Sequence, residues 1–526
     1  MNALSQLSEP TTDSGISGKA PSASSPARAS ATAVARATAW LETRRARRVM
    51  YVALSLQLAV AVGFAIVYRP FDLQIYLWGG KAVTQGLRLY LAQSHANYFT
   101  YPPFAAALFT PFAALPSVVV GVVWELASVA AFAWACVLTM RLAGYRPDLT
   151  VPNSTMPNSI VPNSTVPNST VVLAMVAGGL LLEPVYHTLY LGQVNLFLLA
   201  MVLADIWRAA NGKQSGLGIG IATAIKLTPG IFIVLLLLAR RTRDAKTAAV
   251  TFVCCTLVGF AVDPSASWLY WTHVFYDTAR VSAGYISNQS PYALEVRMLG
   301  GPSHVGMWYD LVPVIIGGIG LVIATVLARR NDWLGAAAVT GIAGLMVSPI
   351  SWTHHWVWVL PALVVMWRGG TRSRIAAVCG YVLFCVAPMW FTPHSGATGD
   401  YGWHGVVTLI ANSFLIPGLA FLGYLAVRTW QSRPSLARQS LARPSRAASG
   451  EVAAAPVQQR GGVVVPGLYV AHPADDDLVI AARQVVLDHA LDRSEHTVQA
   501  RTAIPSWPVG DPVPVGSQPS LREVSG

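Results

Sequence analysis

Long apolar runs alternate with short polar breaks between residues 49 and 428, and this pattern sets the first prediction for the fold. The clearest run, residues 49–68, contains no Asp, Glu, Lys or Arg. A helix needs about 20 such residues to cross the hydrocarbon core of a bilayer. Eleven further runs follow, at residues 103–115, 117–140, 171–186, 194–208, 215–238, 247–263, 311–328, 333–350, 355–367, 375–392 and 405–428. The pattern predicts an all-α, polytopic transmembrane protein of about 10–13 helices.

Several of these runs are too short or too interrupted to be ideal spans. Residues 103–115 form a short run, and Pro184, Pro229 and Pro349 fall within or beside others. Broken helices are tolerated at membrane depth where they line a protein cavity. Three such breaks favour a functional cavity over a simple membrane anchor.

Composition supports a membrane protein. The chain of 526 residues is 54% hydrophobic and 11% charged, whereas soluble domains carry about 25% charged residues. The formal charge of +12 could suggest a nucleic-acid partner, but the basic residues gather beside apolar runs, at 44–48, 240–243, 329–330 and 368–374. This distribution is typical of loops retained in the cytoplasm. It predicts that the first helix runs outwards and that Asp72 emerges on the extracytoplasmic side.

The pattern also predicts three regions. Residues 1–48 are rich in Ala, Ser, Thr and Pro and are expected to form a disordered cytoplasmic extension. Residues 49–428 form the transmembrane domain, and residues 429–526 a mostly disordered cytoplasmic tail. Within the membrane domain, residues 151–170 repeat a Pro-Asn-Ser motif, where a repeat expansion is favoured over glycosylation, although three asparagines fit the acceptor sequence.

Asp72 is the first candidate for chemistry. It follows the first apolar run in Pro70-Phe-Asp-Leu-Gln-Ile-Tyr. Aspartate is a favoured N-cap residue, so the carboxylate could begin a short helix over residues 73–83. A carboxylate at the outer rim of a cavity also suits a general base that acts on a hydroxyl group. The residue alone leaves both interpretations open.

Polar side chains inside apolar runs form a second set of candidates. Gln193 and Asn195 lie in Gly-Gln-Val-Asn, where an amide needs a neighbouring helix or a sugar hydroxyl as its partner. Lys226 lies in the middle of the run 215–238, just before the break at Pro229. A lysine at that depth pairs with an acid, snorkels or binds an anion such as a phosphate.

Arg297, His354 and His355 complete the candidates from residue chemistry. Arg297 lies in the long segment 264–310 and suits phosphate recognition, although a loop arginine is often only solvated. Adjacent histidines on a helix point about 100° apart and rarely share a metal ion. We therefore predict no metal site, and a hydrogen bond from one histidine to substrate or phosphate.

Together, these motifs resemble a known family. The ordered set comprises Asp72, Tyr101-Pro-Pro, Gly192-Gln-Val-Asn195, Ala224-Ile-Lys-Leu-Thr-Pro229, Asn288-Gln-Ser290 with Arg297, and Ser348-Pro-Ile-Ser-Trp-Thr-His-His355. It is similar to the set in the actinobacterial polyprenol-phosphate-mannose-dependent α-mannosyltransferases, membrane glycosyltransferases of the GT-C superfamily that are related to the lipid-linked arabinofuranosyltransferases. The resemblance covers about residues 49–428.

The resemblance implies transfer of a mannosyl residue from a polyprenyl-phosphate donor to a lipoglycan or glycolipid acceptor. Inversion at the sugar would give an α-linkage, in an extracytoplasmic cavity of a multi-pass cell-membrane protein. It implies that Asp72 is the general base and that no cofactor, nucleotide or nucleic acid takes part. The substrate and the donor phosphate would be bound by Lys226, Arg297, His354, His355, Gln193, Asn195, Asn288 and Gln289.

Two alternatives remain at the level of sequence. One is an arabinofuranosyltransferase that uses polyprenyl-phosphate arabinose. The other is a lipid or sugar transporter with broken helices around a midplane site. The transporter would predict inverted internal repeats, which we do not find in the sequence, and a charged site at the midplane instead of a carboxylate at the outer rim.

Overall fold

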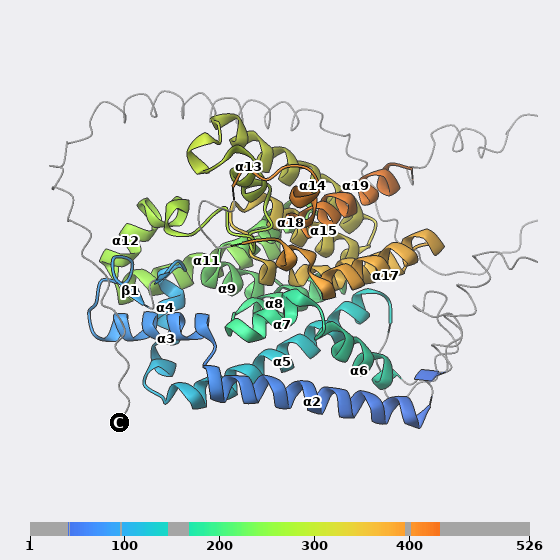
Figure 1. The fold of residues 1–526 in the computed structure, drawn as a ribbon, viewed down its shortest axis with the longest axis horizontal. Coiled ribbons are helices and arrows are strands. Elements are labelled where there is room, and N and C mark those ends of the chain that lie inside the picture. The colour runs from blue at the N-terminus through green and yellow to red at the C-terminus, as the bar shows by residue number, and fades with distance from the viewer. Residues whose placement is uncertain (1–39, 42, 95–96, 146–167, 395–400, 432–526) are drawn as a thin grey trace, which may run out of the picture. The chain divides into compact units, whose positions relative to one another are not determined.

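The computed structural model describes residues 40–41, 43–94, 97–145, 168–394 and 401–431, which are largely helical (Figure 1). All of them belong to one compact unit, Met1–Ala442. In this described part of the chain, the strands β1 (Gln93–Ser94) and β2 (Asn97–Tyr98) pair in an antiparallel hairpin. The all-α prediction is confirmed. The predicted extension, the repeat and the tail lie wholly or mostly outside the described residues.

Four helices are long and apolar enough to cross a membrane by themselves. They are α2 (Arg44–Tyr68), α5 (Ser117–Leu142), α11 (Thr242–Val262) and α14 (Leu311–Arg329), the last extended by a 3₁₀ turn that begins at Met307. They coincide with the predicted runs 49–68, 117–140, 247–263 and 311–328. The bent pair of α6 (Asn168–Gly179) and α7 (Glu183–Leu191), which meet at 69° beside Pro184, makes a fifth candidate span. The chain is a multi-pass membrane protein.

The other predicted runs are also helical, but the helices are shorter. The shorter helices of the membrane domain are α3 (Phe71–Thr84), α4 (Pro103–Ala113), α8 (Asn195–Ala210), α9 (Leu217–Ile225), α10 (Ile231–Leu238), α15 (Trp333–Val347), α16 (Val359–Trp367), α17 (Thr371–Val386), α18 (Val406–Ala411) and α19 (Leu415–Gln431). Residues 264–310, predicted as a loop, instead contain α12 (Pro264–Thr272), α13 (Pro291–Leu299) and several 3₁₀ turns.

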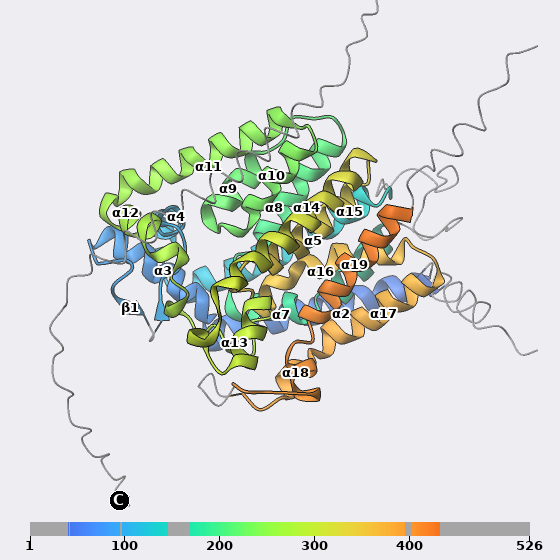
Figure 2. The same ribbon diagram turned by 90° about the horizontal axis from the view of Figure 1, so that it is seen from above.

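Packing separates lipid-facing helices from a buried centre. Helix α2 lies along the lower edge of the bundle in Figure 1 and behind the other helices in the view from above (Figure 2). Its Val52, Leu56 and Val60 are exposed. Helix α5 packs against both α2 and α8, and α14 packs against α15. Almost every residue of α15 is buried. An apolar helix with no exposed face belongs to the interior of the bundle, so α8 and α15 form the frame on which the polar groups are arranged.

Two helices are broken where proline was expected to break them. A 3₁₀ turn, η1 (Thr228–Gly230), contains Pro229 and separates α9 from α10. After α15, the chain passes Pro349 and enters a second 3₁₀ segment, η6 (Thr353–Trp358), before α16. Proline removes a backbone donor and clashes with the preceding turn. The breaks expose non-helical backbone next to the residues that were predicted to bind the donor.

Candidate active site

A tight turn between α2 and α3 presents Asp72. Arg69 adopts a left-handed backbone with φ of 52°, and Pro70 starts α3 without a side-chain cap. Asp72 therefore lies inside the first helical turn, where a carboxylate favours the helix dipole, and does not act as the N-cap. Its Oδ2 atom instead accepts a hydrogen bond of 2.5 Å from Nε2 of Gln193. The capping interpretation is wrong for this side chain.

Gln193 is fixed on both sides of its amide. Its Oε1 atom accepts hydrogen bonds from the hydroxyls of Tyr76, at 2.6 Å, and Tyr101, at 2.9 Å. These two bonds define which end of the amide carries oxygen, so its nitrogen must face the carboxylate of Asp72. The network joins α3, the segment before α4 and the segment after α7 at one point, and it holds the carboxylate in place.

Gly192 allows this contact to form. It ends α7 with φ of 70°, a left-handed conformation that glycine adopts without strain. A Cβ atom at this position would lie 2.7 Å from Cβ of Pro70 and 2.8 Å from Cβ of Leu73. The missing side chain thus lets the end of α7 approach the start of α3 and brings Gln193 to Asp72.

The surroundings of Asp72 favour a stronger base. Burial raises the pKa of its carboxyl above the ordinary value, while the Gln193 hydrogen bond and the charge of Lys226 lower it. Burial is the larger effect because a carboxylate loses hydration inside the protein. A carboxylate with a raised pKa accepts a proton more readily than a solvated one, provided that it is ionised at the working pH.

Lys226 follows the end of α9 in an extended conformation, directly before the η1 break. Its Nζ atom donates a hydrogen bond of 2.9 Å to Oδ1 of Asn195 and lies 2.9 Å from Nε2 of His355. It also lies 5.4 Å from the centre of the Tyr101 ring. Asn195, Lys226 and His355, which were predicted separately from the sequence, therefore meet.

The two adjacent histidines have different surroundings. His355 contacts Lys226, whereas the ring of His354 has no hydrogen-bond partner at either nitrogen among the described residues. His354 is buried, with 5% of its surface exposed, and its ring lies 4.7 Å from that of His355. A buried imidazole without partners is costly unless a ligand supplies them.

In the described part of the chain, no group of three or more His, Cys, Asp or Glu could hold a metal ion.

A pocket opens beside the lysine. Its polar lining residues are Asn195, Lys226, Thr228 and His355. The remaining wall is apolar and comes from α8, α10, α15 and the η6 segment, with the residues Leu198, Leu199, Pro229, Ile231, Phe232, Gly341, Gly344, Leu345, Val357 and Trp358. A cavity lined by a lysine, a few polar groups and many apolar side chains suits a lipid with an anionic head.

Asn288, Gln289 and Arg297 lie apart from this cluster and hold the backbone that carries it. The amide of Asn288 donates to the carbonyls of Ala283 and Pro349, at 2.8 and 3.0 Å. Backbone bonds of Gln289 with Ser351, and of Thr353 with Ser287, align this loop with the histidine segment. The predicted contact of these residues with substrate stays a prediction.

Arg297 is almost fully buried, with 1% of its surface exposed. It donates a 2.9 Å hydrogen bond to the carbonyl of Asn288 and a further bond to the side chain of Asn412. The guanidinium therefore connects α13 with the chain before α19. Its predicted role in phosphate binding likewise stays a prediction.

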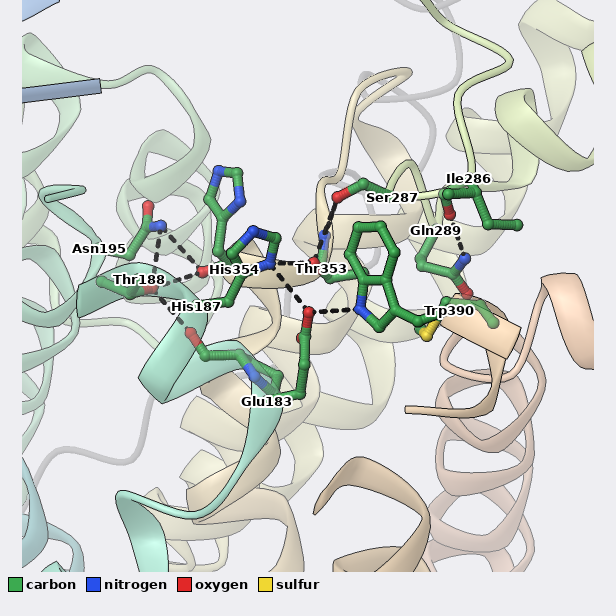
Figure 3. A network of polar contacts seen from close by, with 12 residues as sticks. Glu183, His187, Thr188, Asn195, Ile286, Ser287, Gln289, Thr353, His354 and Trp390 are labelled. Atoms are coloured by element: carbon green, nitrogen blue, oxygen red, sulfur yellow. Dashed lines mark hydrogen bonds and ion pairs between the residues drawn. The ribbon is translucent and has the colours of Figure 1, made fainter. Parts of the chain in front are cut away.

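Sequence reasoning missed a second polar group on α7 (Figure 3). Nδ1 of His187 lies 2.9 Å from Oε1 of Glu183 and 2.9 Å from Oγ1 of Thr353. The same glutamate oxygen accepts a hydrogen bond from the indole of Trp390. The available signal was the spacing of four between a glutamate and a histidine in an otherwise apolar helix, which places both on one face.

Comparisons with known proteins agree on one family. The model of Glycosyltransferase family 87 matches residues 99–349. This range includes Gln193, Lys226 and Arg297, and it excludes Asp72 and His354. No solved structure matches the chain.

Two curated relatives come from Mycobacterium tuberculosis. One, from strain ATCC 25618 / H37Rv, is a polyprenol-phosphate-mannose-dependent alpha-(1-2)-phosphatidylinositol mannoside mannosyltransferase. It is 31% identical over 373 residues, which cover 67% of this chain and 84% of the relative. The other, from strain CDC 1551 / Oshkosh, is a polyprenol-phosphate-mannose-dependent alpha-(1-2)-phosphatidylinositol pentamannoside mannosyltransferase. It is 29% identical over 412 residues, which cover 72% of this chain and 88% of the relative.

Proposed function

Because the chain belongs to glycosyltransferase family 87, a family of membrane glycosyltransferases, we propose that it transfers mannose from polyprenyl-phosphate mannose to a glycolipid acceptor. The resemblance drawn from the sequence motifs is confirmed at the level of this family. The relatives are named for phosphatidylinositol mannosides, and an acceptor of this kind, or a related lipoglycan, is part of the proposal. The enzyme is a glycosyltransferase, which excludes the transporter interpretation.

Asp72 acts as the general base. The acceptor hydroxyl attacks C1 of the mannosyl group and gives its proton to Asp72, while the bond between C1 and the phosphate oxygen breaks. Attack from the face opposite the phosphate inverts the configuration and forms an α-linkage from a β-linked donor. Gln193 holds the carboxylate at 2.5 Å, so the base is positioned before the acceptor arrives.

Lys226 stabilises the leaving phosphate. Charge develops on the phosphate oxygen as the glycosidic bond breaks, and a fixed cation there lowers the barrier. The meeting of Lys226 with Asn195 and His355, at 2.9 Å each, is the observation that carries this proposal. The ring of His354, which has no hydrogen-bond partner among the described residues, supplies a further hydrogen bond. The apolar pocket wall suits the first isoprenoid units of the lipid.

The reaction takes place on the extracytoplasmic side. Helix α2 has 25 residues and therefore spans about 37 Å. Its basic start carries Arg44, Arg45, Arg47 and Arg48, and its other end leads directly into Asp72. Basic residues are retained in the cytoplasm, so the carboxylate lies at the opposite membrane surface.

The donor assay tests the substrate. Purified full-length protein in lipid nanodiscs is supplied separately with polyprenyl-phosphate mannose and polyprenyl-phosphate arabinose, together with a phosphatidylinositol mannoside. We expect transfer from the mannose donor alone, and an α-anomeric signal in the product by NMR. Transfer from polyprenyl-phosphate arabinose alone would show that the donor sugar is arabinose and not mannose. Activity with neither donor would overturn the proposal.

Asp72→Asn tests the base. The amide preserves the size of the side chain but cannot accept a proton, so we expect kcat to fall by about 10²–10⁴-fold while donor binding is retained. Asp310→Asn, which changes an exposed acid at the start of α14, is the matched control and should leave kcat unchanged. Near wild-type transfer by Asp72→Asn would refute the assignment of the base.

A further inference from the structure

A buried glutamate on α7 has an imidazole as its counterion. The side chain of Glu183 is 1% exposed, and its only ion-pair partner among the described residues is His187. Burying a carboxylate is expensive unless an opposite charge and hydrogen bonds compensate. The indole of Trp390 supplies one of these bonds, at 2.9 Å. Among the described residues, His187 is therefore the group that can balance this charge.

The same contacts fix the orientation of the imidazole (Figure 3). Nδ1 carries the bonds to both Glu183 and Thr353, so Nε2 is the nitrogen on the far side of the ring. His187 is more open than its partner, with 16% of its side chain exposed against 1% for Glu183. Within the pair, the carboxylate is thus enclosed and the imidazole is the more accessible group.

That edge lies among the groups of the candidate site. The His187 ring is 5.3 Å from that of His354, in an edge-to-face arrangement. Six residues further along the chain, Gln193 contacts Asp72. Thr188, next to His187, donates a hydrogen bond of 3.0 Å to the carbonyl of His354. The end of α7 therefore connects the carboxylate of Asp72 with the histidine segment.

We propose that His187 is a further catalytic residue, whose Nε2–H donates a hydrogen bond to the sugar phosphate as the glycosidic bond breaks, and that Glu183 is its positioning residue. No proton has to leave His187 in this step. The electron pair of the broken bond stays on the phosphate oxygen, and the acceptor proton goes to Asp72. The inference rests on the proposed function, to which it adds a second hydrogen-bond donor for the phosphate.

The test separates rate from binding. His187→Asn places an amide nitrogen where Nδ1 lies, so the bonds to Glu183 and Thr353 can persist while the Nε2 edge is lost. We expect kcat to fall about 100-fold and the KM for polyprenyl-phosphate mannose to stay within about threefold. Glu183→Gln preserves an oxygen for Trp390 but removes the charge, and kcat should fall about tenfold.

The double variant distinguishes catalysis from structural support. If Glu183 acts only through His187, the variant with both changes is no slower than His187→Asn alone. Independent structural defects would multiply to about 1,000-fold and would lower the melting temperature together. His394→Asn is the matched control, because this exposed ring also lies against Trp390, at 5.5 Å, and kcat should be unchanged.

The outcomes separate the two proposals. Failure of the wild-type protein to use the mannose donor overturns the proposed function. Wild-type transfer with an unchanged kcat in His187→Asn overturns the role of His187 alone, as does a multiplicative loss in the double variant. Should His187→Asn fail to fold, Glu183→Gln decides, because an unchanged kcat in that variant also overturns the inference.

Discussion

Single residues in this site are held mainly by other side chains. Asp72 is held by Gln193, and Gln193 by two tyrosine hydroxyls, Tyr76 and Tyr101. Each member removes rotational freedom from the next, so the reacting group is positioned without help from the substrate. Removing one member changes both the position and the protonation of the carboxylate.

The pH dependence of the reaction follows from this network. Burial raises the pKa of Asp72, so kcat/KM should fall as the pH drops through that raised value and the base becomes protonated. The Gln193 hydrogen bond stabilises the charged form and lowers the pKa. Gln193→Met should therefore move the acidic limb of the kcat/KM profile to higher pH. A limb that stays in place or moves to lower pH would contradict this account.

At the scale of elements, short broken helices bring polar groups into the membrane domain. Lys226 lies on extended backbone at the end of α9, and the two histidines lie in the 3₁₀ segment η6. Gln193 follows the end of α7. A continuous helix would direct these side chains around its axis at 100° intervals. Interrupting three helices at one level lets groups from distant parts of the sequence converge.

Gly192→Ala should disrupt this convergence. The new methyl group would meet Pro70 and Leu73 at under 3 Å, on a backbone with φ of 70°. We expect kcat to fall more than tenfold because α7 must move away from Asp72. Gly212→Ala is the control, since Gly212 has a similar φ of 67° but open space around it. It should cost only about 1 kcal/mol of stability and preserve kcat.

Arg297→Met tests how the loop before α13 is held. The change leaves the carbonyl of Asn288 and the amide of Asn412 without their buried donor. A buried acceptor left without its donor costs about 1–3 kcal/mol, so the melting temperature should fall. An unchanged melting temperature with a raised donor KM would instead support the phosphate role predicted from the sequence.

At the scale of the whole molecule, basic turns gather at one end of the bundle. Arg329 donates a hydrogen bond to the carbonyl of Leu238, and Arg330 to that of Thr429. Three turns that are distant in the sequence are thus joined by arginine side chains. This agrees with a common cytoplasmic surface for these turns, opposite the surface that carries Asp72.

Labelling of single cysteines tests this orientation. The five native cysteines are replaced, and a new cysteine is introduced at exposed Lys81, on α3, or at exposed Lys213, before α9. We expect an impermeant maleimide to label Lys81→Cys in intact cells and Lys213→Cys only after permeabilisation. Labelling of Lys213→Cys from outside would reverse the proposed side of the reaction.

The sequence alone determined the class of fold and singled out most of the residues that form the candidate site. Long uncharged runs have few alternatives to helices in a bilayer, because every backbone polar group must be satisfied internally. The same cost makes a polar residue such as Lys226 conspicuous within an apolar run. Local pattern and composition were sufficient for these inferences.

Only the tertiary structure decided which of these residues meet. Asp72 could have been an N-cap from its local sequence, and the contact with Gln193, 121 positions away, removed that interpretation. Arg297 was predicted from the sequence to bind phosphate, and in the structure it donates to a buried backbone carbonyl. His187 was overlooked in the sequence, and in the structure it pairs with a buried glutamate. Burial and the choice of hydrogen-bond partner depend on packing between distant segments, which no short stretch of sequence contains.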